Sequence, residues 1–136
     1  MHLIVCVDDR MGMTFGGRRQ SRDRLLCEDV VWTVRQRGGL LYASPYSAPL
    51  FEGMAADVLR VSDTYLTDAG AADFCFCERE KPSSVQSLVD TLTVYRWNRH
   101  YPSDRKLDLD LSRYQRIEAS EFAGSSHEKI TKEIYQ

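Results

Sequence analysis

The chain has few residues that can cross-link the fold or interrupt its helices and strands: its 136 residues include four cysteines and four prolines. It also lacks any apolar run near the ~20 residues that a membrane-spanning helix needs. No basic segment followed by an apolar stretch and a cleavage site marks a secretory signal. We therefore predict a cytoplasmic protein with no membrane partner. Its 43% hydrophobic and 28% charged residues are typical of a globular chain and argue against disorder.

Spacing argues against a metal centre. No Cys-x-x-Cys pair is present, and Cys75 and Cys77 would place both thiols on one face of a strand. All four cysteines lie in apolar or amphipathic segments, which predicts small buried side chains in a reducing compartment. The histidines, His2, His100 and His127, are far apart in the sequence. We therefore predict no metal ligands. A centre with two metal ions, as in metal-dependent nucleases, needs a cluster of histidines and carboxylates.

Lysine is scarce as well, with four residues against 14 arginines, and the net charge is −2. Broad affinity for nucleic acid normally rests on a basic face, so RNA is the weaker expectation for a partner, although the sequence leaves it open. Arginine suits two-point contact with carboxylate or phosphate groups. Arginine usage in the genome accounts for the same count equally well.

The apolar pattern predicts one α/β domain spanning residues 1–136. Short β-branched and apolar runs predict buried strands, and apolar residues at helical spacing predict helices between them. Ser21 is the predicted N-cap of the first helix, and Gly38 its end. Strands are expected at 2–7, 40–43, 58–61, 73–77 and 92–97, a loop at 10–20, and helices at 21–37, at 47–54 and from residue 82.

The last third of the chain has the alternation of half-buried strands. Leucines alternate with polar residues over 107–111, which predicts a strand or an edge segment. Segments 114–122 and 129–135 predict a C-terminal antiparallel hairpin. Successive strands joined by helices are parallel neighbours. The predicted architecture is therefore a three-layer α/β fold, a mixed sheet flanked by helices and closed by this hairpin.

Two segments have the composition of a binding site. Gly16 and Gly17 precede Arg18, Arg19, Gln20, Ser21 and Arg22, where free N–H groups and the helix dipole favour an anion. Further along, Trp97, Asn98 and Arg99 could stack on a ring or contact a phosphate. Both segments have a structural alternative, in which the arginines pair with nearby acids and the aromatics pack in the core.

Strand ends suggest further candidates. Asp9 follows the first strand and Tyr46 follows the second, and ligands of open α/β sheets gather outside the carboxyl ends of the strands. Asp9 could equally bond loop N–H groups or pair with Arg10. Parallel strands would place Asp9 and Tyr46 at the same end of the sheet, and we expect the two segments above to meet over one shared hollow.

These pieces resemble a compact dihydrofolate-reductase-like fold. The resemblance rests on LIVCVDDRMGM at 3–13, on Asp23 eleven residues after Gly12, and on the Tyr101-Pro102 turn before the terminal hairpin. In that family a carboxylate on the first helix contacts the pteridine ring, which implies Asp23 as the candidate catalytic residue. The chain lacks the family's Pro-Trp pair before the acid and its Gly-Gly loop, so no cofactor is assigned.

The segments RRQSRD at 18–23 and WNRHYP at 97–102 are also similar to those of a small Firmicutes family, some of whose members carry the name ribonuclease Z. The spacing of the histidines contradicts that activity. The sequence instead favours binding of an anionic or nucleotide-like small molecule at the Arg-rich turn, with catalysis left open. The alternative is an RNA-contacting or regulatory protein-interaction module without catalysis.

Overall fold

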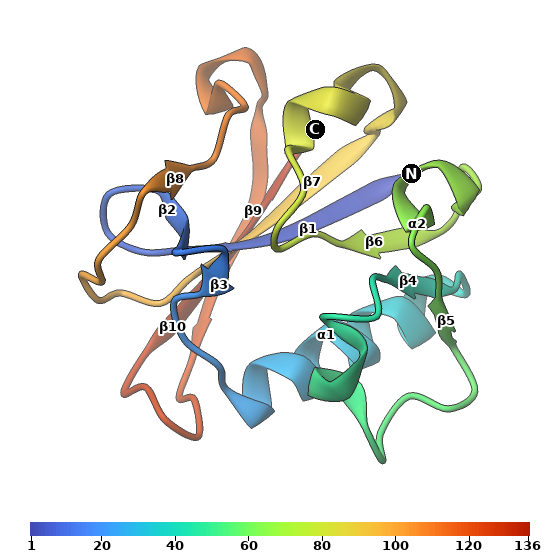
Figure 1. Ribbon diagram of the computed structural model, residues 1–136, viewed down its shortest axis with the longest axis horizontal. Helices are drawn as coiled ribbons and strands as arrows, with labels where there is room; N and C mark the ends of the chain where they lie inside the picture. The colour runs from blue at the N-terminus through green and yellow to red at the C-terminus, as the bar shows by residue number, and fades with distance from the viewer.

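The computed structural model describes residues 1–136 and contains a seven-stranded mixed sheet with the order β5-β4-β6-β1-β7-β10-β9 (Figure 1). Strands β5, β4, β6, β1 and β7 are parallel, whereas β10 pairs antiparallel with both β7 and β9. This confirms the predicted fold class and the terminal hairpin. The strands are β1 His2–Val7, β4 Leu41–Ala43, β5 Leu59–Val61, β6 Phe74–Phe76, β7 Thr91–Arg96, β9 Arg116–Phe122 and β10 Ile130–Tyr135.

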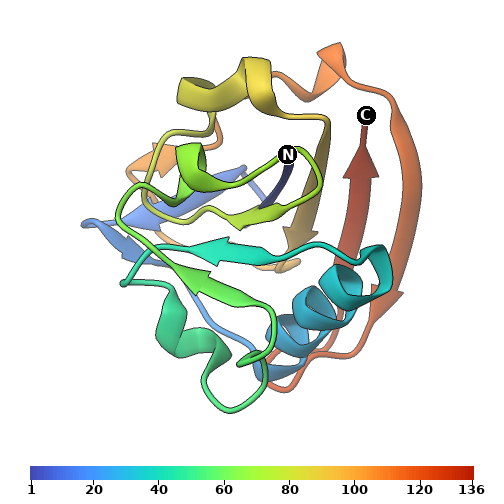
Figure 2. The same cartoon turned by 90° about the vertical axis from the view of Figure 1, so that its right-hand side faces the viewer.

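Helices cover both faces of this sheet. Strand β1 is apolar on both sides, and each side is buried under one of these helical layers. Leu3 and Val5 belong to one buried cluster, and Ile4 between them belongs to the other. Helix α1, Arg24–Arg37, packs on the Ile4 face. The short helix α2, Tyr65–Asp68, and the 3-10 helix η2, Pro82–Leu88, pack on the opposite face (Figure 2).

The N-cap of helix α1 lies two residues later than predicted. Asp23, not Ser21, is the N-cap: its backbone is extended and its carboxylate accepts a hydrogen bond from the Leu26 N–H. The prediction for Ser21 was wrong because either residue has a capping side chain, and the backbone turn that selects one is set by tertiary contacts. The helix ends as predicted at Gly38, whose φ of 80° favours glycine.

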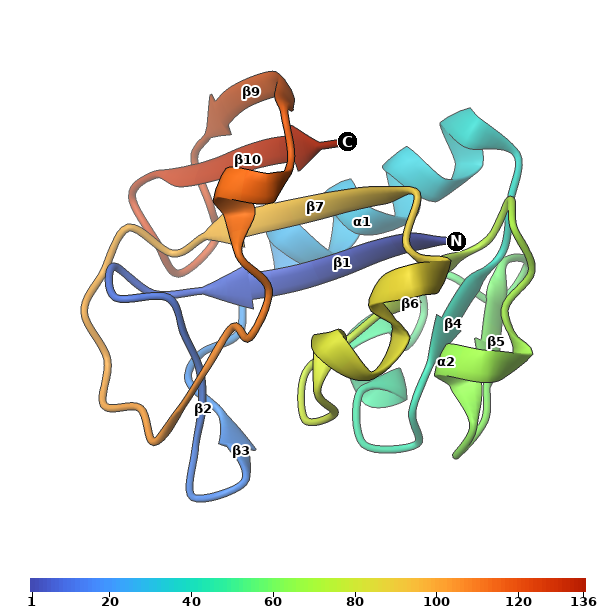
Figure 3. The same cartoon turned by 90° about the horizontal axis from the view of Figure 1, so that it is seen from above.

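Residues 10–20 were predicted as a loop, but they form a hairpin. Strand β2, Gly12–Phe15, pairs antiparallel with β3, Arg18–Arg19, and the two are joined by a Gly16-Gly17 turn in which both glycines have positive φ. Strand β8, Arg105–Lys106, pairs with the other side of β2. This small sheet projects from the carboxyl end of β1 (Figure 3), where a ligand was expected.

Two other segments differ from their predictions. The helix expected near 47–54 is a single 3-10 turn, η1 Ala48–Phe51. The leucines of 107–111 alternate in burial, with Leu109 buried, but the segment forms no ladder and leads into the 3-10 turn η3, Leu111–Arg113. Period-two alternation reports an extended backbone with one buried side, and it does not require a partner strand.

Candidate functional site

Asp23 stands where the N-terminus of α1 meets the loop between β9 and β10. Besides capping Leu26, its carboxylate accepts hydrogen bonds from the backbone N–H groups of Ser125 and Ser126, at 3.0 and 2.8 Å. The Nδ1 atom of His127 lies 3.0 Å from the second oxygen. A side chain at Gly124 would collide with this carboxylate. The loop therefore closes over the helix end and seals Asp23, which is only 2% exposed.

These contacts determine the charge of the Asp23 carboxyl. Burial raises its pKa, but the hydrogen bonds from His127, Ser125, Ser126 and Leu26 outweigh burial and hold the pKa well below its usual range. The carboxylate is thus ionised, with its lone pairs directed at donors in the chain. Such a group is a weak proton acceptor, which argues against Asp23 as a general base.

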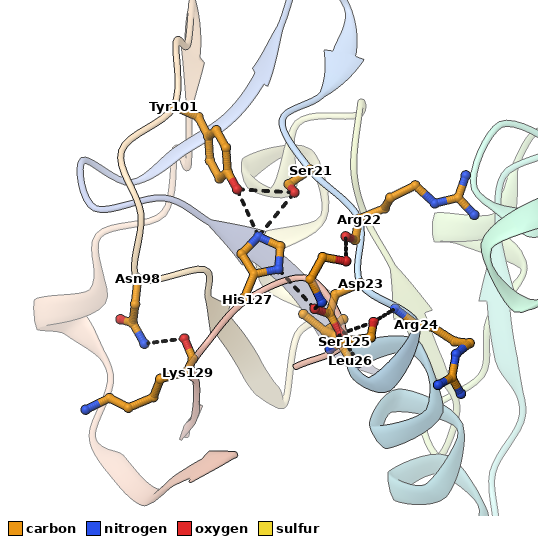
Figure 4. A network of polar contacts seen from close by, with 11 residues as sticks. Ser21, Arg22, Asp23, Arg24, Leu26, Asn98, Tyr101, Ser125, His127 and Lys129 are labelled. Atoms are coloured by element: carbon orange, nitrogen blue, oxygen red, sulfur yellow. Dashed lines mark hydrogen bonds and ion pairs between the residues drawn. The ribbon is translucent and has the colours of Figure 1, made fainter. Parts of the chain in front are cut away.

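His127 links Asp23 to two hydroxyl groups (Figure 4). Because ionised Asp23 only accepts hydrogen bonds, Nδ1 of His127 carries a proton. Nε2 of His127 lies 2.9 Å from the Tyr101 hydroxyl and 3.2 Å from that of Ser21. The imidazole ring also stacks on Trp97, with 4.6 Å between ring centroids. Segments that were predicted separately, at the first helix and after β7, therefore meet at one histidine.

Ser21, His127 and Asp23 have the residue types and order of contacts of a serine-histidine-aspartate triad. The surroundings differ from those of a working triad. The Tyr101 hydroxyl is closer to Nε2 than Ser21 is, and His127 is only 4% exposed, so a leaving group has no path to the imidazole. We interpret the network as a structural clamp on the β9–β10 loop.

Arg19 is held inside the chain. Its guanidinium makes two contacts with the buried carboxylate of Glu78, at 2.8 and 2.9 Å, and lies 4.3 Å above the Tyr46 ring centroid. The Tyr46 hydroxyl accepts the Arg19 backbone N–H, and Ser47 donates to Glu78. This group joins β3 to the ends of β4 and β6. The space expected at the strand ends is therefore occupied by the chain's own ion pair.

A small cavity of about 10 Å³ remains beside this ion pair, enough for about one water molecule. Arg19, Gln20, Ser21 and Trp97 line it together, so the Arg-rich turn and the later aromatic segment do approach one another. The Gln20 amide nitrogen donates to the carboxylate of the buried Asp8. The shared hollow predicted from the sequence is thus far too small for a nucleotide-like ligand.

The other sequence candidates lie apart from this cavity. Asn98 donates from its side chain to the Lys129 carbonyl, at 3.1 Å, and to the Thr131 hydroxyl. Asp9 and Arg99 are exposed and joined through their backbones, with the Asp9 N–H donating to the Arg99 carbonyl. Arg18, also exposed, pairs with Phe15 across the β2–β3 hairpin.

A larger cleft, of about 600 Å³, opens on the other side of the 22–24 backbone. Its rim includes the arginines Arg22 and Arg24, whose side chains extend away from His127 (Figure 4). Leu50 and Met54 supply apolar surface from η1 and the turn after it, and Glu52 supplies a carboxylate. The cleft therefore combines cationic, anionic and apolar surface at the start of α1.

Sequence reasoning missed the loop residues Ser125, Ser126 and His127, together with Glu78. The two serines fit the turn of the predicted hairpin, and a single histidine does not by itself indicate a functional role. Gly124 was the available hint, since a glycine in a loop can mark a close approach of two backbones. Only the closure of the sheet brings this loop within reach of Asp23.

The side chains do not group as a metal centre would require. No cluster of three or more histidine, cysteine, aspartate or glutamate residues is arranged to hold a metal ion. All four cysteines are free, and three of them are buried. Among the helices, none combines the length and apolar character needed to cross a membrane.

Comparison with solved structures shows what this architecture resembles. The chain is similar to dihydrofolate reductase from Enterococcus faecalis, solved with NADP(H) and RAB-propyl, with a TM-score of 0.64 over 99% of this chain and 94% of that one. Sequence identity is 9%, so the likeness concerns the fold alone. No protein-family model matches the sequence, and no curated protein matches it. The fold is dihydrofolate-reductase-like, as the resemblance at 3–13, Asp23 and Tyr101-Pro102 implied.

Proposed function

We propose that the protein binds an anionic, nucleotide-like small molecule in the cleft at the start of α1, with Arg22 as the principal anion contact. One observation carries the proposal: Arg22 forms no ion pair within the chain, yet it lines a cleft large enough for such a ligand. Arg24 beside it pairs only with the exposed Glu28, at 2.6 Å. Exposed pairs are weak, so Arg24 can change partner at little cost.

The clamp on Asp23 refines where the anion would bind. The first N–H groups of a helix commonly bind an anion. Here the Asp23 carboxylate accepts a hydrogen bond from the Leu26 N–H, and the Ser125 hydroxyl accepts one from the Arg24 N–H. The anionic group would therefore contact guanidinium groups, with the helix dipole as a secondary contribution. This differs from the site first expected, which relied on free backbone N–H groups.

The remaining lining indicates the rest of the ligand. Leu50 and Met54 offer an apolar wall on which a ring can pack, and Glu52 can accept a hydrogen bond from an N–H or O–H group. A phosphate joined to a planar ring that carries an amino group matches all three features. A simple inorganic anion would use only the arginines.

Thermal unfolding with two probes, adenosine monophosphate and inorganic phosphate, tests this proposal. We expect adenosine monophosphate to raise Tm, because a ligand at ten times its Kd stabilises the folded state by about 1.4 kcal/mol. Phosphate alone should raise Tm less. The Arg22→Ala variant should lose the rise. Arg113→Ala, which removes an exposed arginine in η3, serves as the matched control and should keep it.

Sodium chloride at equal ionic strength separates specific binding from screening, since screening acts on all exposed charges alike. Two results would count against the proposal. One is a Tm that neither probe raises above the salt control. The other is an equal rise in the wild type and in Arg22→Ala, which would place the bound anion elsewhere.

A further inference from the structure

A second hollow lies on the outer side of α1, next to the cleft that Arg22 lines. It is an open groove of about 680 Å³, and its apolar lining includes Val31, Trp32 and Phe122. Trp32 is 58% exposed, the largest fraction among the exposed large apolar side chains of the chain. Because water is a poor environment for such a surface, an exposed tryptophan within an apolar hollow is typical of a binding site.

The groove and the cleft adjoin one another. Met54 lines both, and the ion pair of Arg24 with Glu28 crosses their boundary, since Arg24 lines the cleft and Glu28 the groove. The two side chains are 65% and 45% exposed, so opening this pair costs little. Along the axis of α1, Trp32 lies about 12 Å beyond Arg24, given the helical rise per residue. One extended ligand can therefore occupy both hollows.

The charges of the two hollows differ, and the difference sets the orientation of such a ligand. In the groove, Asp29 and Arg35 each pair with an oppositely charged neighbour, at 2.9 and 2.6 Å. The carboxylates of Glu28 and Asp29 would repel an anion placed there. In the cleft, Arg22 has no acidic partner. The anionic end therefore belongs in the cleft, and the groove suits an uncharged group.

We propose that the ligand extends past Met54 and places an uncharged aromatic group on Trp32. This inference rests on the proposed function, because it takes Arg22 to bind the anionic end of the same ligand. The ligand class is then an anionic nucleotide whose base carries a further aromatic substituent. The indole of Trp32 offers a flat surface on which such a ring stacks, and Phe122 adds apolar surface to the same groove.

Four related compounds separate the two parts of the ligand. They are adenosine, adenosine monophosphate, and the same two compounds with a benzyl group on the amino nitrogen of the base. Titration calorimetry measures each Kd. We expect the benzyl group to lower the Kd of the monophosphate about tenfold, because the groove removes the apolar surface of the ring from water. Benzyladenosine, which lacks the anion, should bind more weakly than benzyladenosine monophosphate.

Two variants locate the benzyl group, with its effect measured relative to adenosine monophosphate in the same variant. Trp32→Ala should lose the gain. Leu88→Ala is the matched control, because it removes another exposed apolar side chain from η2, on the opposite face of the sheet, and it should keep the gain. Tryptophan emission gives a second readout: Trp97 is only 4% exposed, so a blue shift caused by the benzyl group reports Trp32.

The outcomes distinguish this inference from the proposed function. If adenosine monophosphate binds through Arg22 but the benzyl group adds no affinity, the extension into the groove is overturned and the arginine cleft stands. A gain that persists in Trp32→Ala also overturns the extension, as does benzyladenosine that binds as tightly as its monophosphate. If neither monophosphate binds in a way that depends on Arg22, both proposals are wrong.

Discussion

At the scale of single residues, Asp23 is the candidate from the sequence that links the start of α1 to the β9–β10 loop. Its carboxylate caps α1 and accepts hydrogen bonds from a loop 102 residues away. We predict that Asp23→Ala lowers the free energy of unfolding by about 3 kcal/mol, since it removes a cap and leaves buried donors without an acceptor. Urea denaturation measures the change.

Asp110 provides the comparison for this prediction. It is the exposed N-cap of η3 and accepts the Ser112 N–H, as Asp23 accepts that of Leu26. Removing it leaves no buried donor, so Asp110→Ala should cost about 1 kcal/mol or less. Equal losses in the two variants would show that the contacts of Asp23 with the β9–β10 loop add little.

At the scale of elements, the β2–β3 hairpin is attached to the main sheet through the Arg19–Glu78 pair. Both side chains are largely buried, at 21% and 9% exposure. Removing one partner of such a pair leaves an uncompensated charge, so Glu78→Ala should destabilise the protein by about 3 kcal/mol. Hydrogen exchange should quicken first in the hairpin, at Thr14 and Arg19.

The exposed pair between Arg35 and Asp57 is the control for the hairpin prediction. Its side chains are 46% and 60% exposed, so Asp57→Ala should change stability by less than about 1 kcal/mol. If Glu78→Ala leaves hairpin exchange unchanged, β2 and β3 are held by β8 and backbone contacts instead of by this ion pair.

At the scale of the whole molecule, three buried carboxyls make stability depend on acidity. Burial raises the pKa of Asp8, Asp23 and Glu133, but hydrogen bonds and, at Glu133, the neighbouring arginines outweigh it and lower each pKa. A lowered folded-state pKa adds stability above the unfolded pKa of about 4, and that stability is lost as the pH falls through the folded pKa. We therefore expect the urea midpoint to fall steeply below about pH 4.

Substitution at one of these sites shows the origin of the slope. Glu133→Gln removes one titrating group, so the variant should be less stable at neutral pH but lose less stability between about pH 5 and pH 2. Asp63→Asn, at an exposed position without an ion pair, should leave the slope nearly unchanged. A wild-type midpoint that stays constant down to pH 2 would contradict the role of the buried carboxyls.

Much of the architecture was predictable from the sequence because its causes are local. The β-branched run at His2–Val7 forms a buried strand wherever it lies, and a glycine such as Gly38 ends a helix by its own backbone freedom. Alternation and turn residues likewise identified the β9–β10 hairpin. The segments that failed were short: β2 and β3 contain too few residues to show a period.

The site was decided by contacts between distant segments. The sequence pointed to Asp23, Arg19 and Trp97 as functional candidates. Whether the two charges are unpaired and the Trp97 ring is exposed depends on the side chains that pack against them. Glu78 neutralises Arg19, and His127 covers Trp97 and bonds Asp23. These partners are 59, 30 and 104 residues away in the chain, and no local pattern encodes such pairings, because folding of the sheet alone sets which loops meet. Composition and periodicity thus determined the α/β class, whereas the tertiary structure decided which polar groups remain available to a ligand.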